Sequence, residues 1–361
     1  MPESVKLRLP DMQPLLSWYH TSKRDLPWRH TRDPYRIWVS EIMLQQTRVE
    51  AVMRYYQRFL ERLPDVQALA DCPEGELLKL WEGLGYYSRV RNMQRAARVI
   101  VQQHAGRFPR TYEEILALPG IGEYTAGAIG SFAFDLPLPA VDGNVLRVVA
   151  RLTALEEDVL SPKTRRAVTE AVAQAQPALC AADFNQAMIE LGALVCLPNG
   201  APKCAECPLA ATCLARKAGL QERLPIRKKN APRKIQHKTV LILREGERVA
   251  LRRRPSDGLL AALYEPFCLE GALDSDAVQA FLQAQGLFPL HITPIGEAKH
   301  IFTHLEWHMC GFEVILPLGS ITKMEQNGAK NPFINLFFAQ RDEVDTRYAL
   351  PSAYAAYRAY M

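Results

Sequence analysis

The chain has 361 residues, 48% of them hydrophobic and 23% charged, which is enough apolar material for two or more folded domains and argues against disorder. A formal net charge of +5 permits binding to an anionic partner such as DNA without indicating one. No signal-peptide pattern begins the chain, and no apolar run approaches the ~20 residues that span a bilayer. We therefore expect a cytoplasmic protein with no membrane partner.

Helical patterns dominate residues 1–222. Asp33 followed by Pro34 has the order that helix starts prefer, and it opens a helical segment that runs to residue 60. Thr111 and Glu114 have the spacing of a capping box at the start of a later helix. These patterns predict an all-α first domain.

Two glycines follow that later helix, in the stretch LPGIGEYTAGAI (118–129). A turn through Gly120 and Gly122 into a second helix would form a hairpin whose backbone N–H groups can bind a phosphate. On this pattern alone, an ordinary turn between two helices remains the alternative.

Four of the eight cysteines are clustered in CLPNGAPKCAECPLAATC, residues 196–213. Cys196, Cys204, Cys207 and Cys213 can by number bind either a zinc ion or an iron-sulfur cluster. The sequence alone does not choose between the two.

Composition changes at residues 223–237, where basic residues meet two prolines and predict an extended interdomain linker. From 238 to 361 the patterns are mixed α/β. Two strands are expected around a turn at Glu245–Gly246, and residues 300–316 also read as a strand. The fold class is thus an all-α domain followed by a smaller α/β domain.

The hairpin, together with Asp142 in AVDGNVLRV, resembles the helix-hairpin-helix base-excision DNA glycosylases related to endonuclease III. Three longer blocks, at residues 25–49, 83–92 and 184–196, resemble the adenine DNA glycosylases of the MutY family. This resemblance covers nearly the whole chain. It implies a glycosylase domain with a cluster loop at 196–213 and a Nudix-like domain at 238–361 that recognises 8-oxoguanine.

Two carboxyl groups have the positions that such chemistry needs. Glu41 follows Ile37 and Trp38 by one helical turn, so it is expected on an inward face with a raised pKa. Asp142 precedes a helix whose N–H groups and dipole favour its ionised form. A salt-bridged surface glutamate and a simple N-cap are the alternatives for the two residues.

The resemblance assigns roles to these groups. It implies that Glu41 protonates N7 of an extruded adenine and activates water, that Asp142 stabilises the cation-like sugar, and that Asn144 and Tyr124 position the reacting groups. Relatives that also cut the backbone carry a lysine where Tyr124 stands, so the resemblance implies a monofunctional enzyme. The positions implied to surround the adenine are Arg24, Leu26, Trp28, Arg29, Val49 and Gln186, and those implied to fill the base stack are Leu44, Gln46 and Tyr86.

The C-terminal domain lacks the glycine-led, metal-binding REXXEE box of an active Nudix hydrolase. By resemblance to a Phe-Ser-His segment, Phe302, Thr303 and His304 would read the base opposite the adenine, with threonine in place of serine. His300, His304 and His308 recur every four residues, which also allows a metal site, although hydrogen-bonded or solvated histidines are commoner.

The implied cofactor is a 4Fe-4S cluster on the four clustered cysteines, although seven residues rather than the usual six separate Cys196 from Cys204. The implied partner is duplex DNA containing adenine opposite 8-oxoguanine or guanine. We also expect a nucleoid-associated monomer that can meet repair or replication proteins at its linker. The alternatives are an endonuclease III-like glycosylase/lyase and a non-catalytic iron-sulfur protein that binds DNA.

Overall fold

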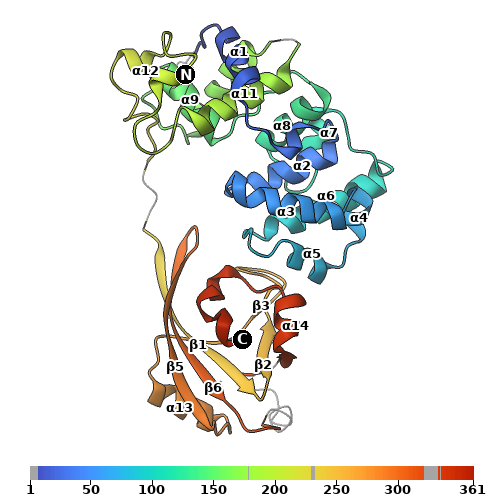
Figure 1. Ribbon diagram of the computed structural model, residues 1–361, viewed down its shortest axis with the longest axis vertical. Coiled ribbons are helices and arrows are strands. Elements are labelled where there is room, and N and C mark those ends of the chain that lie inside the picture. The colour runs from blue at the N-terminus through green and yellow to red at the C-terminus, as the bar shows by residue number, and fades with distance from the viewer. Residues whose placement is uncertain (1–6, 178, 229–231, 321–331, 334) are drawn as a thin grey trace. The chain divides into compact units, whose positions relative to one another are not determined.

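The computed structural model describes residues 7–177, 179–228, 232–320, 332–333 and 335–361. The chain forms two compact units, shown in Figure 1, one built from residues 1–71 and 89–229 and the other from 72–88 and 230–361. The first unit is helical and the second is a mixed α/β fold, so the predicted fold class is confirmed.

Short helices make up the first unit. They are α1 (Gln13–Ser22), η1 (Pro27–Arg29), α2 (Pro34–Leu44), α3 (Val49–Arg62), α4 (Val66–Asp71), α6 (Ser88–Gln103), α7 (Tyr112–Leu116), α8 (Glu123–Phe134), α9 (Gly143–Leu152), α10 (Pro162–Ala175), α11 (Ala181–Leu194), η2 (Cys204–Glu206) and α12 (Leu214–Lys217).

Helix α2 begins as the sequence predicts, because the Asp33 carboxylate accepts the backbone N–H of Tyr35 at 2.9 Å. The helical segment 33–60 is nevertheless divided into α2 and α3. The break falls at Gln46, which has a left-handed φ of 59°. The guanidinium of Arg89 donates to the carbonyls of Ile42 and Met43 at 2.7 and 3.2 Å and so satisfies the open end of α2.

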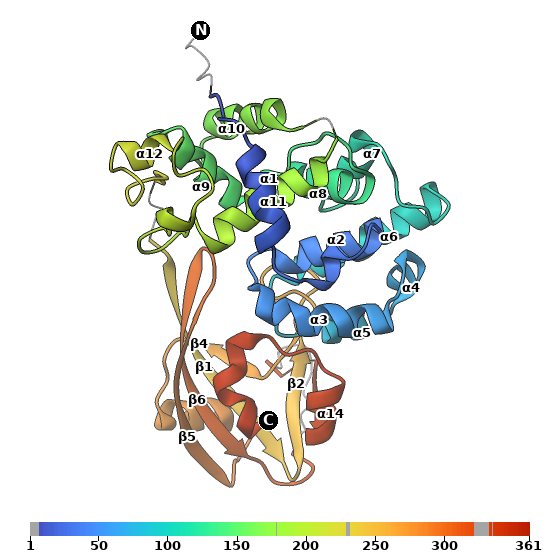
Figure 2. The ribbon, with the colours of Figure 1, turned by 45° about the horizontal axis from the view of Figure 1, so that its top comes forward.

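Helix α9 lies at the centre of the first unit. Every residue from Val145 to Leu152 is buried, including Arg147 and Arg151. Helices α1, α9 and α11 lie close together (Figure 2), and their apolar side chains belong to one hydrophobic cluster. The start of α9, where Asp142 lies, is therefore anchored in packed protein.

The second unit contains one twisted sheet. Its elements are α5 (Glu74–Leu80), β1 (Lys234–Glu245), β2 (Arg248–Arg253), β3 (Tyr264–Glu265), β4 (Phe267–Glu270), α13 (Ser275–Ala284), β5 (His291–Ile301), β6 (Leu305–Ile315), β7 (Leu336–Gln340), α14 (Arg341–Thr346) and η3 (Ser352–Tyr360).

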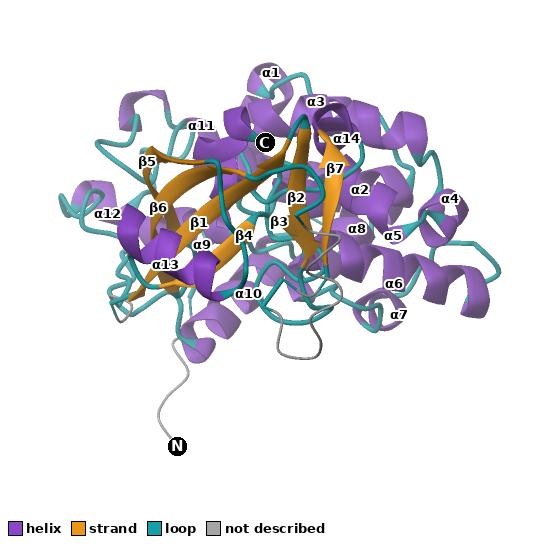
Figure 3. Cartoon of the chain, turned by 90° about the horizontal axis from the view of Figure 1, so that it is seen from below, coloured by secondary structure: helices purple, strands orange, loops and turns teal. Residues whose placement is uncertain are grey.

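The strand order of this sheet is β3-β2-β1-β6-β5, with β4 paired to β1 and β7 to β2. Strands β1 and β6 are parallel, and the other pairs are antiparallel. One face packs against α14 and η3, and the other packs against α13 (Figure 3). The turn predicted at Glu245–Gly246 is present, with a φ of 62° at the glycine.

The single strand predicted over residues 300–316 is wrong. The structure has a hairpin of β5 and β6 there, with Phe302, Thr303 and His304 in its turn. The backbone N–H of Phe302 donates to the carbonyl of Leu305 at 2.9 Å, which closes the turn. The segment lacks the glycine and asparagine signals that mark hairpin turns, so its apolar residues read as one strand.

Residues 72–88 belong with the second unit rather than with the helices on either side of them in sequence. The Glu82 carboxylate accepts from Arg358 Nη1 at 3.0 Å and from the backbone N–H of Leu350 at 3.3 Å. Arg253 Nη2 also donates to Glu74 at 2.8 Å.

The predicted linker, 223–237, is partly structured where it is described. The Arg151 guanidinium donates to the carbonyl of Leu224 at 2.9 Å, and the carbonyl of Ile226 accepts from the backbone of Val159 at 3.1 Å. Lys234 to His237 form the start of β1, and residues 229–231 lie outside the described residues. In the described parts of the chain, no helix has both the length and the apolar character needed to cross a membrane.

Candidate active site

The first unit contains a cavity of about 1510 Å³. It lies where α2, the turn before α8, and the starts of α9 and α10 approach α11. The predicted site residues that line it are Arg24, Leu26, Trp28, Arg29, Glu41, Leu44, Gln46, Val49, Gly120, Gly122, Tyr124, Asp142, Asn144 and Gln186.

Glu41 lies on the buried part of α2 and is 6% exposed. The hydroxyl of Tyr124 on α8 donates to Glu41 Oε2 at 2.6 Å. The pKa of Glu41 is raised to about 7, mainly because burial disfavours the charged carboxylate; the hydrogen bond from Tyr124 opposes this shift, and the nearby Asp142 carboxylate adds to it. The predicted raised pKa is therefore confirmed, and near neutral pH Glu41 can both hold and release a proton.

Asp142 caps helix α9. Its Oδ1 accepts the backbone N–H groups of Asn144 and Val145, each at 2.8 Å, and its Oδ2 accepts from Asn144 Nδ2 at 2.6 Å. The surrounding protein nevertheless raises the pKa of Asp142, because desolvation outweighs these bonds. A helix start alone predicts a shift toward a lower pKa, so that part of the prediction is wrong.

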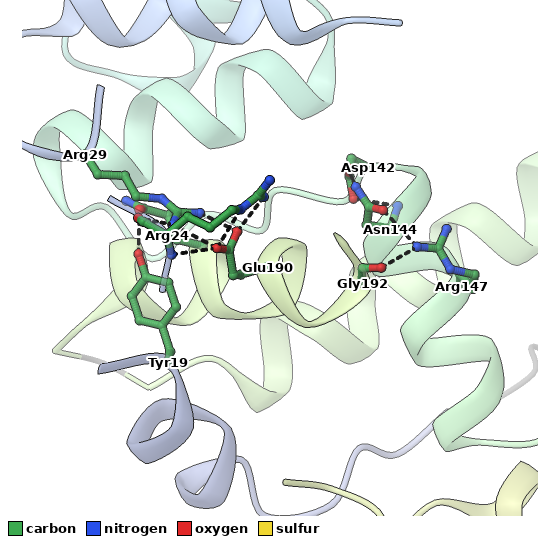
Figure 4. Close-up of polar contacts among 9 residues, drawn as sticks. Tyr19, Arg24, Arg29, Asp142, Asn144, Arg147, Glu190 and Gly192 are labelled. Carbon is green, nitrogen blue, oxygen red and sulfur yellow. Dashed lines mark hydrogen bonds and ion pairs between the residues drawn. The ribbon is translucent and has the colours of Figure 1, made fainter. Parts of the chain in front are cut away.

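Arg147 connects Asn144, the partner of this carboxylate, to the cysteine loop. Its Nη2 donates to Asn144 Oδ1 and to the carbonyl of Gly192, both at 2.8 Å (Figure 4). Its Nε donates to the carbonyl of Cys196 at 2.7 Å. Arg147 is 3% exposed, so its charge is held by these acceptors rather than by water. Asn144 therefore has a fixed orientation on the cavity wall.

Arg24 and Arg29 converge on Glu190, a residue that the sequence analysis did not identify (Figure 4). Glu190 lies on α11 four residues after Gln186, so the two share one helix face. That spacing was the available signal, but a glutamate inside an apolar helix is not distinguishable by pattern from a surface residue.

The two glycines of the turn before α8 have different roles. Gly120 has a φ of 77°, and a side chain there would collide with Asn92. Gly122 is the N-cap of α8 without a side-chain cap, and a Cβ there would meet only open space. The start of α8 therefore faces the cavity with its backbone available to an anion.

The remaining predicted contacts lie in the second unit. Tyr86 has a left-handed φ of 45° and is 47% exposed, and its hydroxyl lies 3.4 Å from Thr303 Oγ1. Phe302 packs edge-on against Trp307 with ring centroids 4.8 Å apart, so it supports the turn rather than projecting from it. Thr303 and His304 are exposed at its tip.

The structure does not support the alternative metal site at the three histidines. His300 lies on β5, His304 in the turn and His308 on β6, so they do not share one strand. His308 Nε2 bonds Glu306 at 2.6 Å. Among the residues that the structure describes, no three histidine, cysteine or acidic side chains are grouped as ligands of one metal ion.

The four clustered cysteines line a second, small cavity beside α9 and α11. Lys203 donates its backbone N–H to the carbonyl of Val195 at 2.9 Å, which brings together the ends of the loop between Cys196 and Cys204. Gly200, inside this loop, has a φ of 75°, a left-handed conformation that favours glycine. Arg151 Nη1 lies 3.2 Å from Cys196 Sγ.

Comparison with known proteins agrees with this architecture. A family profile described as "HhH-GPD superfamily base excision DNA repair protein" matches residues 39–174, and one described as "NUDIX domain" matches residues 239–359. A thermostable thymine-DNA glycosylase aligns with a TM-score of 0.52 and 30% identity over 57% of this chain and 95% of its own. A trapped endonuclease III–DNA intermediate, at 24% identity and a TM-score of 0.50, shares the fold over 58% of this chain and 95% of its own. Fold and site define a helix-hairpin-helix DNA glycosylase with a Nudix-like domain.

Sequence relatives narrow this class. The adenine DNA glycosylase of Buchnera aphidicola subsp. Baizongia pistaciae is 36% identical over 84% of this chain and 86% of its own length. The mouse enzyme of the same name is 37% identical over 81% of this chain and 68% of its own. The chain belongs to the adenine DNA glycosylase family.

Proposed function

We propose that this protein hydrolyses the N-glycosidic bond of adenine paired with 8-oxoguanine, or with guanine, in duplex DNA. The observation that carries the proposal is the position of Glu41, held by Tyr124, in the same cavity as Asp142. An adenine inside a duplex cannot reach such a cavity, so the base must be extruded into it.

In this mechanism Glu41 donates its proton to N7 of the adenine, which makes the base a better leaving group. With a pKa of about 7, the same carboxylate can then accept a proton from the attacking water. The Asp142 carboxylate stabilises positive charge on the sugar as the bond to the base breaks. Asn144 and Tyr124 keep the two carboxyl groups in place.

The reaction ends at an abasic site because position 124 is a tyrosine. Strand cutting through a Schiff base requires an amine, and the Tyr124 hydroxyl cannot provide one. Burial and the neighbouring carboxylates raise the pKa of Tyr124 well above its usual value, so its hydroxyl stays protonated and available to Glu41.

The base opposite the adenine is read by the β5–β6 turn. Thr303 and His304 offer hydrogen-bonding side chains at its exposed tip, and Thr303 lies beside Tyr86, which the family resemblance assigns to the base stack. Hydrogen bonds of this kind distinguish 8-oxoguanine from guanine by an expected ~1 to 3 kcal/mol per good contact.

One experiment tests both parts of the proposal. Labelled duplexes with adenine opposite 8-oxoguanine or guanine are incubated with enzyme in excess and then analysed with and without alkali. The wild-type protein should yield cut strand only after alkali, and faster with 8-oxoguanine. Strand cutting without alkali would indicate a glycosylase/lyase, and binding without base release would indicate a non-catalytic DNA-binding protein.

The double variant Thr303→Ala/His304→Ala is assayed on the same duplexes to test recognition of the opposite base. It should reduce the preference for 8-oxoguanine over guanine by about 10- to 100-fold while adenine is still released. Ser320→Ala, in the turn that follows β6, is the matched control in the second unit. An unchanged preference in the double variant would place opposite-base recognition elsewhere.

The cofactor that fits the cysteine loop is a 4Fe-4S cluster on Cys196, Cys204, Cys207 and Cys213. All four thiols line one cavity. A cubane binds each thiolate through a different iron, so it does not require three of them on one ion. The chain's own contribution there is to fix the loop, through Arg147 and Arg151 on the backbone of Cys196 and Leu197.

Protein purified without oxygen is expected to be brown and to contain about four irons per chain. Iron and zinc are measured by elemental analysis alongside the visible spectrum. Cys204→Ser should lower the iron content, whereas Cys72→Ser, at a buried cysteine outside the loop, should not. Stoichiometric zinc without visible absorption would reject the cluster.

Two further expectations complete the proposal. The basic linker is the surface on which repair or replication proteins would dock. The protein would work in the cytoplasm on nucleoid DNA, as a monomer.

A further inference from the structure

Glu190 is fully buried on α11, and its carboxylate is shared by two arginines. Oε1 accepts the backbone N–H and Nε of Arg24, both at 2.9 Å, and Oε2 accepts Arg24 Nη2 at 2.8 Å. Arg29 donates through Nη1 at 3.1 Å and through Nη2 at 2.6 Å. Each guanidinium therefore binds this carboxylate through two nitrogens.

The effect of this arrangement is to hold Arg24 and Arg29 in place. Two guanidinium groups that approach one another repel, and a buried carboxylate between them compensates both charges. The two arginines lower the pKa of Glu190 to about 2, so it is ionised throughout the range in which the enzyme can work. Arg29 also donates to the carbonyl of Arg24 at 2.9 Å, which ties the pair into one unit.

The arginines reach the cavity and Glu190 does not. Arg24 and Arg29 are among the lining residues, at 30% and 11% side-chain exposure, whereas the Glu190 side chain is 0% exposed behind them. Glu190 can therefore affect a base in the cavity only through the direction in which it holds these side chains.

Gln186 is also held by a residue behind the cavity wall, Tyr19. The hydroxyl of Tyr19 donates to Gln186 Oε1 at 2.7 Å, and the Arg29 guanidinium lies over the Tyr19 ring, 5.7 Å from its centroid. With Oε1 engaged, the amide nitrogen of Gln186 is the group turned toward other partners. One buried layer, Tyr19 and Glu190, thus fixes three side chains that line the cavity.

We propose that Glu190 is a positioning residue for the extruded base, fixing Arg24 and Arg29, with Tyr19 in the same role for Gln186. The inference rests on the proposed function of this cavity. Pre-oriented donors need no reorganisation when the base arrives, so disorder in this layer slows base release more than it weakens binding of the surrounding duplex.

The test compares Glu190→Gln, Glu190→Asp and Tyr19→Phe in single-turnover release of adenine, with thermal unfolding measured for each protein. Glu190→Gln should slow release by about 10- to 100-fold, the loss expected for hydrogen bonds to a charged group. Glu190→Asp keeps the charge on a shorter side chain and should recover part of the rate. Glu157→Gln removes an equal charge at an exposed position and should leave the rate unchanged.

A second measurement separates positioning from general damage to the fold. Binding to a duplex with a tetrahydrofuran abasic-site analogue in place of the adenosine places no base in the cavity, so its affinity should be the same for wild type and Glu190→Asp. If Glu190 acts through Arg29, the double variant Glu190→Gln/Arg29→Gln should lose little more than either single variant.

The inference would be overturned if the loss of rate in the double variant equalled the product of the losses in the two single variants. It would also be overturned if Glu190→Gln released adenine at the wild-type rate. A loss of affinity for the abasic duplex that equals the loss of rate would also overturn it, because the role would then be structural. Failure of the proposed function would look different, because the wild-type protein itself would then bind the duplex without releasing adenine.

Discussion

Replacing Glu41 by glutamine is expected to slow adenine release by about 10²- to 10⁴-fold, the usual contribution of a general acid–base group. The amide keeps the size of the side chain and an oxygen that can accept from Tyr124, but it cannot donate a proton to N7 and then accept one from water. Release is measured in single turnover, and duplex binding is measured by gel shift. A variant that releases adenine at close to the wild-type rate would remove Glu41 from the mechanism.

Glu41 should also determine how the rate of adenine release depends on pH. Because the pKa of Glu41 is raised to about 7, the fraction of enzyme holding the catalytic proton declines as the pH rises through 7, and the release rate should decline with it.

The same raised pKa should affect stability. A raised pKa in the folded state means that folding favours the protonated carboxyl of Glu41. Its stabilising contribution is full below its unfolded pKa of 4.5 and is lost as the pH rises to about 7. The thermal stability of Glu41→Gln should therefore improve relative to wild type over this interval.

Replacing Asp142 by asparagine is expected to slow release by about 10²- to 10³-fold, as for the loss of one pre-oriented electrostatic group. Asparagine can still cap α9 through its oxygen, so the helix should remain. What is lost is the negative charge near the sugar, and an amide group now meets Asn144 Nδ2 in place of an acceptor.

Asp274→Asn provides the matched control. Asp274 caps α13 in the second unit by accepting the backbone N–H of Ala277 at 2.9 Å, and it is not among the residues that line the cavity. Both variants change an N-cap aspartate, so thermal unfolding should report a similar small loss, while only Asp142→Asn should lose activity. Equal activities for the two variants would mean that Asp142 is a cap and nothing more.

Local signals in the sequence were sufficient for much of this protein. Asp33–Pro34 marks a helix start, Gly120 a turn, and the cysteine spacing a loop, because each depends on groups within a few residues of one another. The inward face of Glu41 follows from helical periodicity in the same way. The family resemblance then gave the two domains and the catalytic roles.

Features that depend on distant residues required the tertiary structure. Glu190 pairs with arginines more than 160 positions earlier in the chain, and residues 72–88 join the second unit through Glu82 and Glu74. The pKa of Asp142 moves upward because the protein packed around α9 removes water, which no helix-start rule includes. The start of α2, the turns marked by glycine and the family could thus be predicted from the sequence alone, whereas the β5–β6 turn, which has no glycine, could not. Which charges share a buried site could be learned only from the folded chain, because the desolvation and pairing of charges depend on everything packed around them.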